Sequence, residues 1–214
     1  MLPDAPAAPP VVGLILAGGL SRRMGGGDKS LRMLAGETLL ARVISRVKPQ
    51  VRAMVLNANG NPSRFSAFDL PVVADAVPGF AGPLAGVLTG LEWAREHAPG
   101  IEWVASFATD APFFPRDLVA RLLEAVESDK ADLACAASNG RRHPVFGLWP
   151  VSLGPQLRRA LVAEGIRKVE DWTGRYRVAV VEYPQRPFDP FFNANAPEDL
   201  AEAERILAAE AARG

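Results

Sequence analysis

The chain has 214 residues, with 24 basic and 24 acidic side chains and no formal net charge. This balance argues against a protein that coats nucleic acid or binds membranes through a polybasic surface, and it confines any anion site to a local cluster. Hydrophobic residues make up 49% of the chain, which suits one globular domain with a sizeable core. The single cysteine, Cys135, excludes an internal disulfide and a cysteine-rich zinc site, and we expect it in the core.

Residues 1–10 are rich in proline and alanine and predict a flexible tail. They contain no basic region followed by an apolar one, so they do not indicate a signal peptide. No apolar run approaches the ~20 residues that span a bilayer, and we expect no membrane association.

Apolar segments from residue 11 onward alternate between patterns typical of strands and of amphipathic helices. Strands are expected at residues 11–16, 51–59, 70–75, 101–110, 131–137, 144–150 and 176–183. Helices are expected at residues 36–47, 82–98, 115–128, 152–165 and 196–212. The alternation predicts a single α/β domain over residues 11–214, a three-layer, Rossmann-like fold around a mostly parallel twisted sheet. Ligands of such folds bind beyond the carboxyl ends of the strands.

The segment "LILAGGLSRRMGGGDKSL", residues 14–31, directly follows the first expected strand. It does not fit a P-loop, because Asp28 stands where that motif needs glycine, and no G-x-G-x-x-G spacing is completed. Its glycines still allow backbone N–H groups to approach a ligand closely. Four basic residues in and just after the segment outnumber its acid by three charges, which favours a triphosphate-binding loop over a solvated surface loop. They are Arg22, Arg23, Lys29 and Arg32.

The loop "LAGGLSRRMGGGDK" resembles the signature of nucleotidyltransferases that transfer NMP from an NTP, and it is most similar to that of the molybdenum cofactor guanylyltransferases. The resemblance continues at "LNAN", "VVAD", "GPLAG", "TDAPFFP", "HP" and "NANAPEDL", so that it covers nearly the whole chain. It implies a cytoplasmic enzyme that uses Mg²⁺ to transfer GMP from GTP to molybdopterin. The products would be the guanine dinucleotide cofactor and pyrophosphate.

The resemblance also implies roles for individual residues. Arg23, Lys29 and Asp110 would be catalytic, and Asp110 would hold Mg²⁺, although an aspartate before proline also suits a turn. Asn57 and Asp75 would bind the guanine nucleotide, whereas Asn57 could equally be a turn residue. The "GPLAG" helix start would lie beside the base, with close packing of small residues as the alternative. Residues expected around the nucleotide are Leu16, Ala17, Gly18, Gly19, Lys29, Asn57, Asp75, Gly82, Pro83, Leu84 and Asp110.

Four residues are candidates for binding the second substrate: Arg142, His143, Asn193 and Asn195. Arg142 could hold a phosphate or lie in a solvated loop before a strand, and His143 could be a structural histidine. Asn193 and Asn195 share a face if the chain is extended, although Asn195 could instead cap the last helix. The sequence shows no serine–histidine–acid pattern that would indicate covalent catalysis.

Two other functions stay open on the sequence alone. A relative that uses CTP or makes a nucleotide sugar would share the fold, although cytidine-transferring relatives tend to carry "LAAG" where this chain has "LAGG". A nucleotide-binding module without turnover is less compatible with an intact Lys29 and Asp110. Proteins that deliver molybdopterin or mature molybdoenzymes are further expected partners, whereas nucleic acid and membranes are not.

Overall fold

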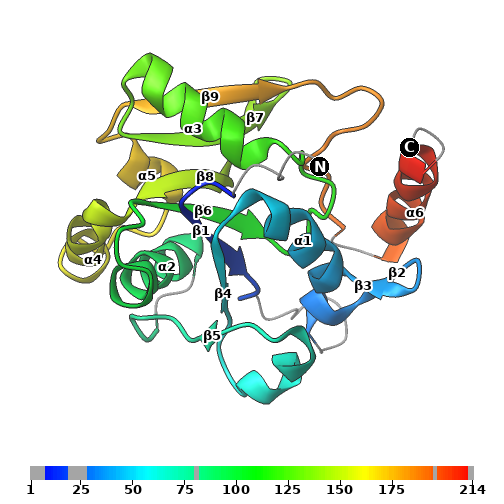
Figure 1. The fold of residues 1–214 in the computed structure, drawn as a ribbon, viewed down its shortest axis with the longest axis horizontal. Coiled ribbons are helices and arrows are strands. Elements are labelled where there is room, and N and C mark those ends of the chain that lie inside the picture. The colour runs from blue at the N-terminus through cyan, green and yellow to red at the C-terminus, as the bar shows by residue number, and fades with distance from the viewer. Residues whose placement is uncertain (1–7, 19–27, 80–81, 195–196, 212–214) are drawn as a thin grey trace, which may run out of the picture.

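The computed structural model describes residues 8–18, 28–79, 82–194 and 197–211. Seven strands form one sheet in the spatial order β5 (Val72–Val73), β4 (Ala53–Asn57), β1 (Val11–Leu16), β6 (Trp103–Ala108), β8 (Arg141–Pro150), β7 (Leu133–Ser138) and β9 (Val178–Tyr183) (Figure 1). Strand β8 runs antiparallel to β6 and β7, and the other neighbours in this described sheet are parallel. The predicted α/β fold with a mostly parallel sheet is confirmed.

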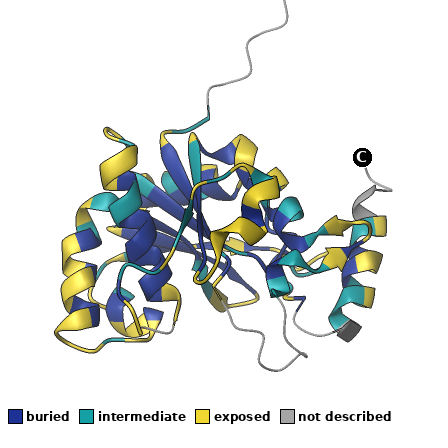
Figure 2. Cartoon of the chain, turned by 90° about the horizontal axis from the view of Figure 1, so that it is seen from below, coloured by how far each residue is buried: buried dark blue, intermediate teal, exposed yellow. Residues whose placement is uncertain are grey.

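Strand β1 shows why the sheet is buried on both faces. Its side chains alternate, so that Val11 and Ile15 enter one core cluster while Val12 and Leu14 enter the other. All four are fully buried, which is why an uninterrupted apolar run forms this strand. Figure 2 shows the buried residues along the strands and on the helix surfaces that pack against them.

Helices cover both faces of the sheet (Figure 1). One core cluster contains residues of α1 (Leu39–Val47) and α3 (Leu118–Asp129), and the other contains residues of α2 (Pro83–His97), α4 (Gly154–Val162) and α5 (Val169–Thr173). Helix α1 begins after Thr38, whose Oγ1 accepts a hydrogen bond from the Ala41 N–H at 3.1 Å. The expected three-layer arrangement is therefore confirmed.

A third, smaller hydrophobic cluster lies beside these layers. It joins the hairpin of β2 (Met33–Leu34) and β3 (Glu37–Thr38) to the C-terminal helix α6 (Pro197–Ala211), as Figure 1 shows. Short 3-10 segments complete the described elements: η1 (Lys29–Leu31), η2 (Lys48–Gln50), η3 (Pro62–Phe68) and η4 (Val151–Leu153).

Several predicted boundaries differ from the observed ones, among them the helix expected from residue 36, which begins at Leu39. Two further differences are informative. The helix expected from residue 115 begins at Leu118, so Pro115 precedes it rather than lying in its first turn. The strand expected from residue 144 begins at Arg141, because residues 141–143 pair with residues 136–138 of β7. Arg142 and His143 are therefore strand residues and not loop residues. The short elements η3, α5 and the hairpin were not predicted, since they are too short to show a period.

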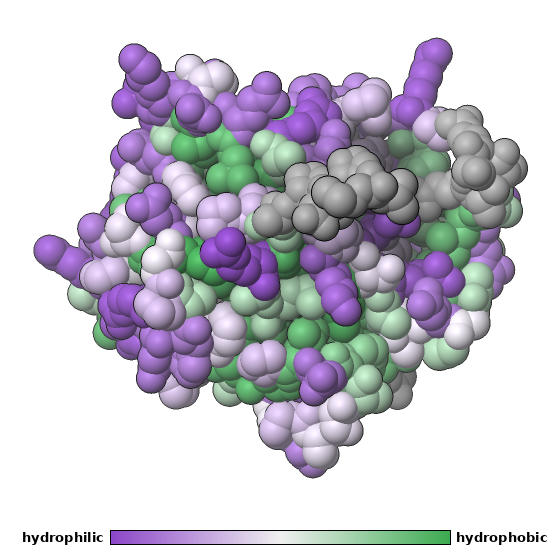
Figure 3. Space-filling view, in the orientation of Figure 1, coloured by the Kyte–Doolittle hydropathy of each residue, from purple (hydrophilic) through white to green (hydrophobic). Residues whose placement is uncertain are grey.

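The outline of the molecule is mostly hydrophilic in the view of Figure 3, with hydrophobic side chains gathered in smaller areas between. Across the described residues, no helix combines the length and the apolar composition that a membrane crossing requires. Cys135 is buried in β7 as expected, and its burial raises the pKa of the thiol. The predicted tail falls mainly on residues 1–7, which lie outside the described residues.

Candidate active site

The carboxyl ends of β1, β4 and β6 lie side by side, because Leu16 pairs with Asn57 on β4 and with Ala108 on β6. Two hydrogen bonds fix the backbone where β1 ends. The Ala17 N–H donates to the Asn57 carbonyl at 2.9 Å, and Thr109 Oγ1 donates to the Leu16 carbonyl at 3.3 Å. The polar residues that follow these three strands therefore meet at one edge of the sheet.

Lys29 and Asp110 form an ion pair at this edge. Lys29 Nζ donates to Asp110 Oδ2 at 2.9 Å, and the two side chains are 21% and 30% exposed. The pair is thus partly shielded but still reachable by a ligand. An ammonium group can bind the phosphates of a nucleotide, and a carboxylate can bind a hard metal ion.

A second ion pair holds the chain just before Lys29. Arg64 Nε lies 2.7 Å from Asp28 Oδ2, and Ser30 Oγ donates to Asp28 Oδ1 at 2.9 Å. Arg64 Nη2 also donates to the Asn59 carbonyl at 2.6 Å. This arginine therefore joins the end of the glycine-rich segment to the turn after β4. In the sequence, Asp28 indicated only that the segment is no P-loop and that it contains one acid, and nothing in the pattern indicated Arg64.

Asn57, Asn59 and Asp75 form a hydrogen-bonded group where β4 and β5 end. Asn57 Nδ2 donates to Asp75 Oδ1 at 3.0 Å, and Asn59 Nδ2 donates to Asp75 Oδ2 at 2.7 Å. The Asp75 N–H donates in return to Asn59 Oδ1 at 2.9 Å. Amide donors thus fix both oxygens of the carboxylate. The structure brings together Asn57 and Asp75, the two residues predicted to bind the guanine nucleotide, and adds Asn59 to them.

The start of helix α2 packs against this group. The helix begins at Pro83, and Gly82 just before it has a φ of 138°, a conformation that favours glycine. A Cβ atom at Gly86 would lie 2.5 Å from both Asn57 Oδ1 and Leu16 Cδ2. Only glycine at this position therefore allows the helix to approach Asn57 so closely.

The residues predicted for the second substrate lie on two segments. Arg142 and His143 are on β8, where Arg142 is exposed and His143 is partly buried. Asn193 is exposed and precedes Ala194, whose N–H donates to the Asp110 carbonyl at 2.7 Å. That bond places the segment carrying Asn193 next to the Lys29–Asp110 pair.

Two residues that sequence analysis missed hold His143 in place. Ser138 Oγ lies 2.8 Å from His143 Nε2 and donates to Asp189 Oδ1 at 3.0 Å. Serine is the middle member of this group, whereas covalent catalysis needs histidine in the middle. Burial lowers the pKa of His143, Asp189 and Glu182 oppose this shift, and Arg141 adds to it.

Three predicted site residues, Gly19, Arg23 and Asn195, lie outside the described residues. Gly18 is described, and a Cβ atom there would lie 3.8 Å from Asn57 Oδ1. The first part of the glycine-rich segment therefore passes beside the group formed by Asn57, Asn59 and Asp75.

Residues 13–186 match the family model described as the MobA-like NTP transferase domain. The chain belongs to this family. A molybdenum cofactor guanylyltransferase of Bradyrhizobium sp. is 62% identical over 200 residues, which cover 94% of each chain. One of Rhodopseudomonas palustris is 61% identical over 203 residues, which cover 95% of each chain. A crystal structure of molybdopterin-guanine dinucleotide biosynthesis protein A from Archaeoglobus fulgidus superposes with a TM-score of 0.70 at 26% identity, covering 92% of this chain and 98% of that one. The recognised family is confirmed.

The donor set of this MobA-like NTP transferase suits a metal that needs few protein ligands. Among the described residues, no group of three or more histidine, cysteine, aspartate or glutamate side chains is placed to hold a metal ion. Mg²⁺ is commonly bound by one or two carboxylates and completes its shell with water and substrate phosphates. Asp110, a single carboxylate paired with the Lys29 ammonium group at 2.9 Å, fits that pattern.

Proposed function

We propose that this chain transfers GMP from GTP to molybdopterin and releases pyrophosphate. The Lys29–Asp110 pair, set beside the Asn57–Asp75 pair on one sheet edge, is the observation that carries the proposal. The names of relatives that are about 60% identical over nearly the whole chain support the same reaction, since those proteins are named molybdenum cofactor guanylyltransferases.

The Asp75 carboxylate provides the preference for guanine. Guanine presents two adjacent donors, N1–H and the 2-amino group, whereas cytosine presents an acceptor next to its amino group. Asn57 and Asn59 hold both carboxylate oxygens in place and leave further lone pairs for a base. A carboxylate held in this way accepts two hydrogen bonds from guanine but meets a lone pair on cytosine.

Lys29 would bind the triphosphate by exchanging the Asp110 carboxylate for phosphate oxygens. Asp110, released from the lysine, would hold Mg²⁺. When bound there, Mg²⁺ would supply charge screening between the two anionic substrates. Gly18 has no side chain to hinder close approach of the triphosphate to the backbone after β1.

The reaction itself requires positioning and charge stabilisation. The terminal phosphate oxygen of molybdopterin attacks the α-phosphorus of GTP, a new P–O bond forms, and the bond to the bridging oxygen breaks as pyrophosphate leaves. Lys29 stabilises negative charge on the departing pyrophosphate. This in-line displacement needs no covalent enzyme intermediate.

Pyrophosphate release tests the proposal. The full chain is supplied with molybdopterin, Mg²⁺ and either GTP or CTP, and Asp110→Ala is compared with wild type. Asp171→Ala, an exposed aspartate on α5, is the matched control. We expect release with GTP that Asp110→Ala abolishes and Asp171→Ala retains. Release with CTP alone would identify a cytidylyltransferase, and nucleotide binding without any release would identify a non-catalytic module.

A further inference from the structure

The hydrogens between Ser138, His143 and Asp189 can be assigned by counting donors. Ser138 Oγ carries one proton and lies within bonding distance of His143 Nε2 and Asp189 Oδ1. The Asp189 oxygens face further donors, because Oδ1 accepts from the Phe191 N–H at 3.0 Å and Oδ2 accepts from Gln185 at 3.3 Å. The carboxylate therefore acts as an acceptor throughout, and it takes the serine proton.

The proton between Ser138 and His143 must then come from the imidazole. If Nε2 carried a lone pair, it would face a lone pair of Ser138 Oγ at 2.8 Å. The arrangement is satisfied when Nε2–H donates to Ser138 and Ser138 donates to Asp189. In the neutral ring this leaves Nδ1 as an acceptor, and among the described residues no hydrogen bond involves that nitrogen.

The position of His143 along β8 places it toward the edge of the sheet where the carboxyl ends of β1, β4 and β6 lie. Ser106 Oγ on β6 donates to the Val145 carbonyl on β8 at 2.6 Å, and the two strands are antiparallel. Because the strands are antiparallel, His143, which precedes Val145 on β8, lies in the same direction along the sheet as Asp110, which follows Ser106 on β6. His143 and Asp110 lie at the same edge of the sheet.

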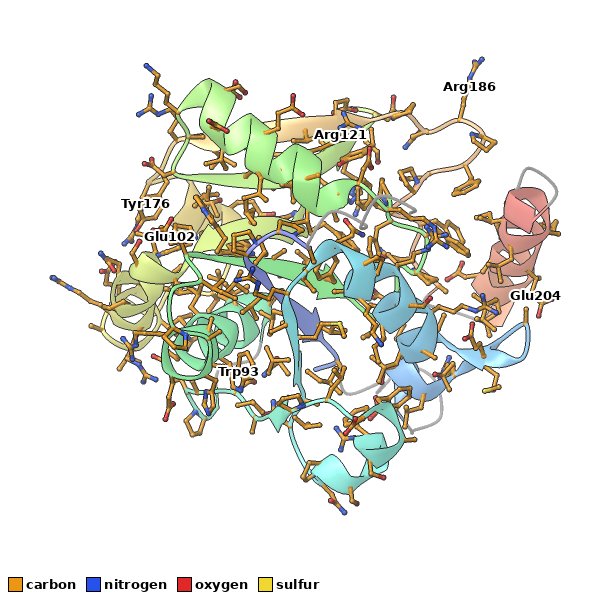
Figure 4. The ribbon with its side chains drawn as sticks, viewed as in Figure 1. Trp93, Glu102, Arg121, Tyr176, Arg186 and Glu204 are labelled. Atoms are coloured by element: carbon orange, nitrogen blue, oxygen red, sulfur yellow. The ribbon has the colours of Figure 1, made fainter. Side chains whose placement is uncertain are left out.

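One segment connects the histidine to the reaction centre. The His143 ring stacks on Phe191, with the ring centroids 4.5 Å apart and the planes inclined by 27°. Three residues later, the Ala194 N–H donates to the Asp110 carbonyl at 2.7 Å. The segment from Asp189 to Ala194 thus spans from the histidine to the Lys29–Asp110 pair. In Figure 4, Arg186, three residues before this segment, extends away from the body of the molecule.

We propose that Ser138 and Asp189 are positioning residues that hold His143 with its proton on Nε2, so that Nδ1 accepts a hydrogen bond from an N–H group of the pterin substrate. The inference rests on the proposed function for the identity of the substrate, and it assigns a specificity role to His143. A pterin offers ring and amino N–H donors, which a neutral acceptor can receive and a cation would repel.

The tautomer can be measured directly, because the chain has two histidines. Long-range ¹H–¹⁵N NMR of the full chain at neutral pH reports which ring nitrogen carries the proton. We expect Nε2–H for His143 and the opposite tautomer for His97, whose Nδ1 lies 3.1 Å from the Trp93 carbonyl. Asp189→Asn keeps an oxygen toward Ser138 and Phe191 and should keep the tautomer. Asp189→Ala frees the serine proton and should shift the tautomer toward Nδ1–H. An Nδ1–H form of His143 in wild type would overturn the proposal.

Kinetics then test the role in binding. His143→Phe keeps an aromatic ring stacked on Phe191 but removes both ring nitrogens. The KM for molybdopterin should therefore rise roughly five- to tenfold, as for one lost hydrogen bond. The KM for GTP should stay within about twofold of the wild-type value. His143→Asn restores an acceptor near the position of Nδ1 and should recover most of the loss. His97→Asn is the control. An equal rise in both KM values, or no rise in that for molybdopterin, would overturn the proposal.

A binding experiment separates this inference from the proposed function. Addition of molybdopterin under anaerobic conditions should shift the Nδ1 signal of His143 and leave that of His97 unchanged. If wild type released no pyrophosphate but this shift occurred, the proposed reaction would fail and the pterin subsite would stand. Turnover without the shift would leave the reaction intact and overturn the role of His143.

Discussion

Lys29 Nζ and Asp110 Oδ2 lie 2.9 Å apart although 81 residues separate them in the sequence. The contact joins the glycine-rich segment to the carboxyl end of β6, and it pairs the residue proposed to bind phosphate with the one proposed to bind a cation. In the absence of nucleotide each charge is neutralised by the other. On the proposed mechanism, binding of a metal–nucleotide complex would replace this ion pair by two separate interactions.

Lys29→Met should lower activity far more than stability. Removal of one donor that stabilises transition-state charge typically costs about 10²- to 10³-fold in kcat. The ion pair with Asp110 is 21% and 30% exposed, so its loss should change the free energy of unfolding by no more than about 1 kcal/mol. Pyrophosphate release and urea unfolding measure the two effects, with Lys48→Met, an exposed lysine of η2, as the control. A large loss of stability with normal kcat would contradict the assigned role.

Gly86→Ala should impair both the fold and GTP binding. The added Cβ would lie 2.5 Å from Asn57 Oδ1, so Asn57 or helix α2 must move. Overpacking of this kind costs about 1–3 kcal/mol in unfolding free energy, and the displaced Asn57 should raise the KM for GTP. Gly154→Ala is the matched control, since its Cβ would meet Leu91 at an ordinary 3.7 Å. Equal unfolding midpoints for the two variants would refute the packing argument.

Asp75→Asn should reduce the selectivity for guanine. The variant keeps the shape of the side chain but loses the charge that both Asn57 and Asn59 orient. A hydrogen bond to a charged group contributes about 1.5–3 kcal/mol, so kcat/KM for GTP should fall by roughly one to two orders of magnitude. ITP lacks the 2-amino group, and the preference for GTP over ITP should therefore shrink in the variant. An unchanged GTP-to-ITP ratio would place the base elsewhere.

Arg64→Met should weaken GTP binding without affecting molybdopterin. Arg64 bonds to Asp28 and to the Asn59 carbonyl, so it couples the residues before Lys29 to the group formed by Asn57, Asn59 and Asp75. The side chain of Arg64 is 34% exposed, and we expect a rise in the KM for GTP of only about two- to fivefold. Arg158→Met, which breaks the pair with Glu92 between α4 and α2, is the matched control. A similar rise for both variants would indicate a general loss of stability.

Acidification should destabilise the protein through His143. Burial lowers its pKa in the folded chain below the ordinary 6.5, so between these two values the unfolded chain binds more protons. The free energy of unfolding therefore falls as the pH drops through 6.5, and this contribution levels off below the folded pKa. Urea unfolding between about pH 7.5 and 5.5 should show this slope in wild type and less of it in His143→Phe. A steeper slope in the variant would contradict the assigned direction.

The sequence indicated, for a simple reason, that the residues proposed to bind the nucleotide lie at one edge of the sheet. Asn57, Asp75 and Asp110 each follow a short apolar run, and parallel strands bring such ends to one edge. The sequence could not show that Ser138 meets Asp189, because 51 residues separate them and nothing in the pattern of β8 reveals its direction. The start of β8 at Arg141 was hidden for a related reason, since its first residues are polar and face solvent.

Arg121 makes a contact that depends on the spatial order of the strands. It projects from α3 beside β9 (Figure 4), where its guanidinium lies 4.1 Å from the Tyr183 ring centroid and donates to the Glu182 carbonyl at 3.2 Å. The β9–β7 pairing places this end of β9 next to Ser138. The contact of Arg121 with β9 and the pairing of β9 with Ser138 can be identified only once the strand order is known.

The antiparallel strand β8 lies between two parts of the sheet that carry residues with different proposed roles. On one side of it, β5, β4, β1 and β6 carry the residues assigned to the nucleotide, and on the other β7 carries Ser138, with β8 itself carrying His143. Substitutions at residues 138–143 could change the acceptor molecule without contacting Asn57 or Asp75, whereas Ala194 bonds to the Asp110 carbonyl and ties its segment to the nucleotide side. A sheet divided in this way lets the site for the acceptor substrate change during evolution while the site for the nucleotide is kept.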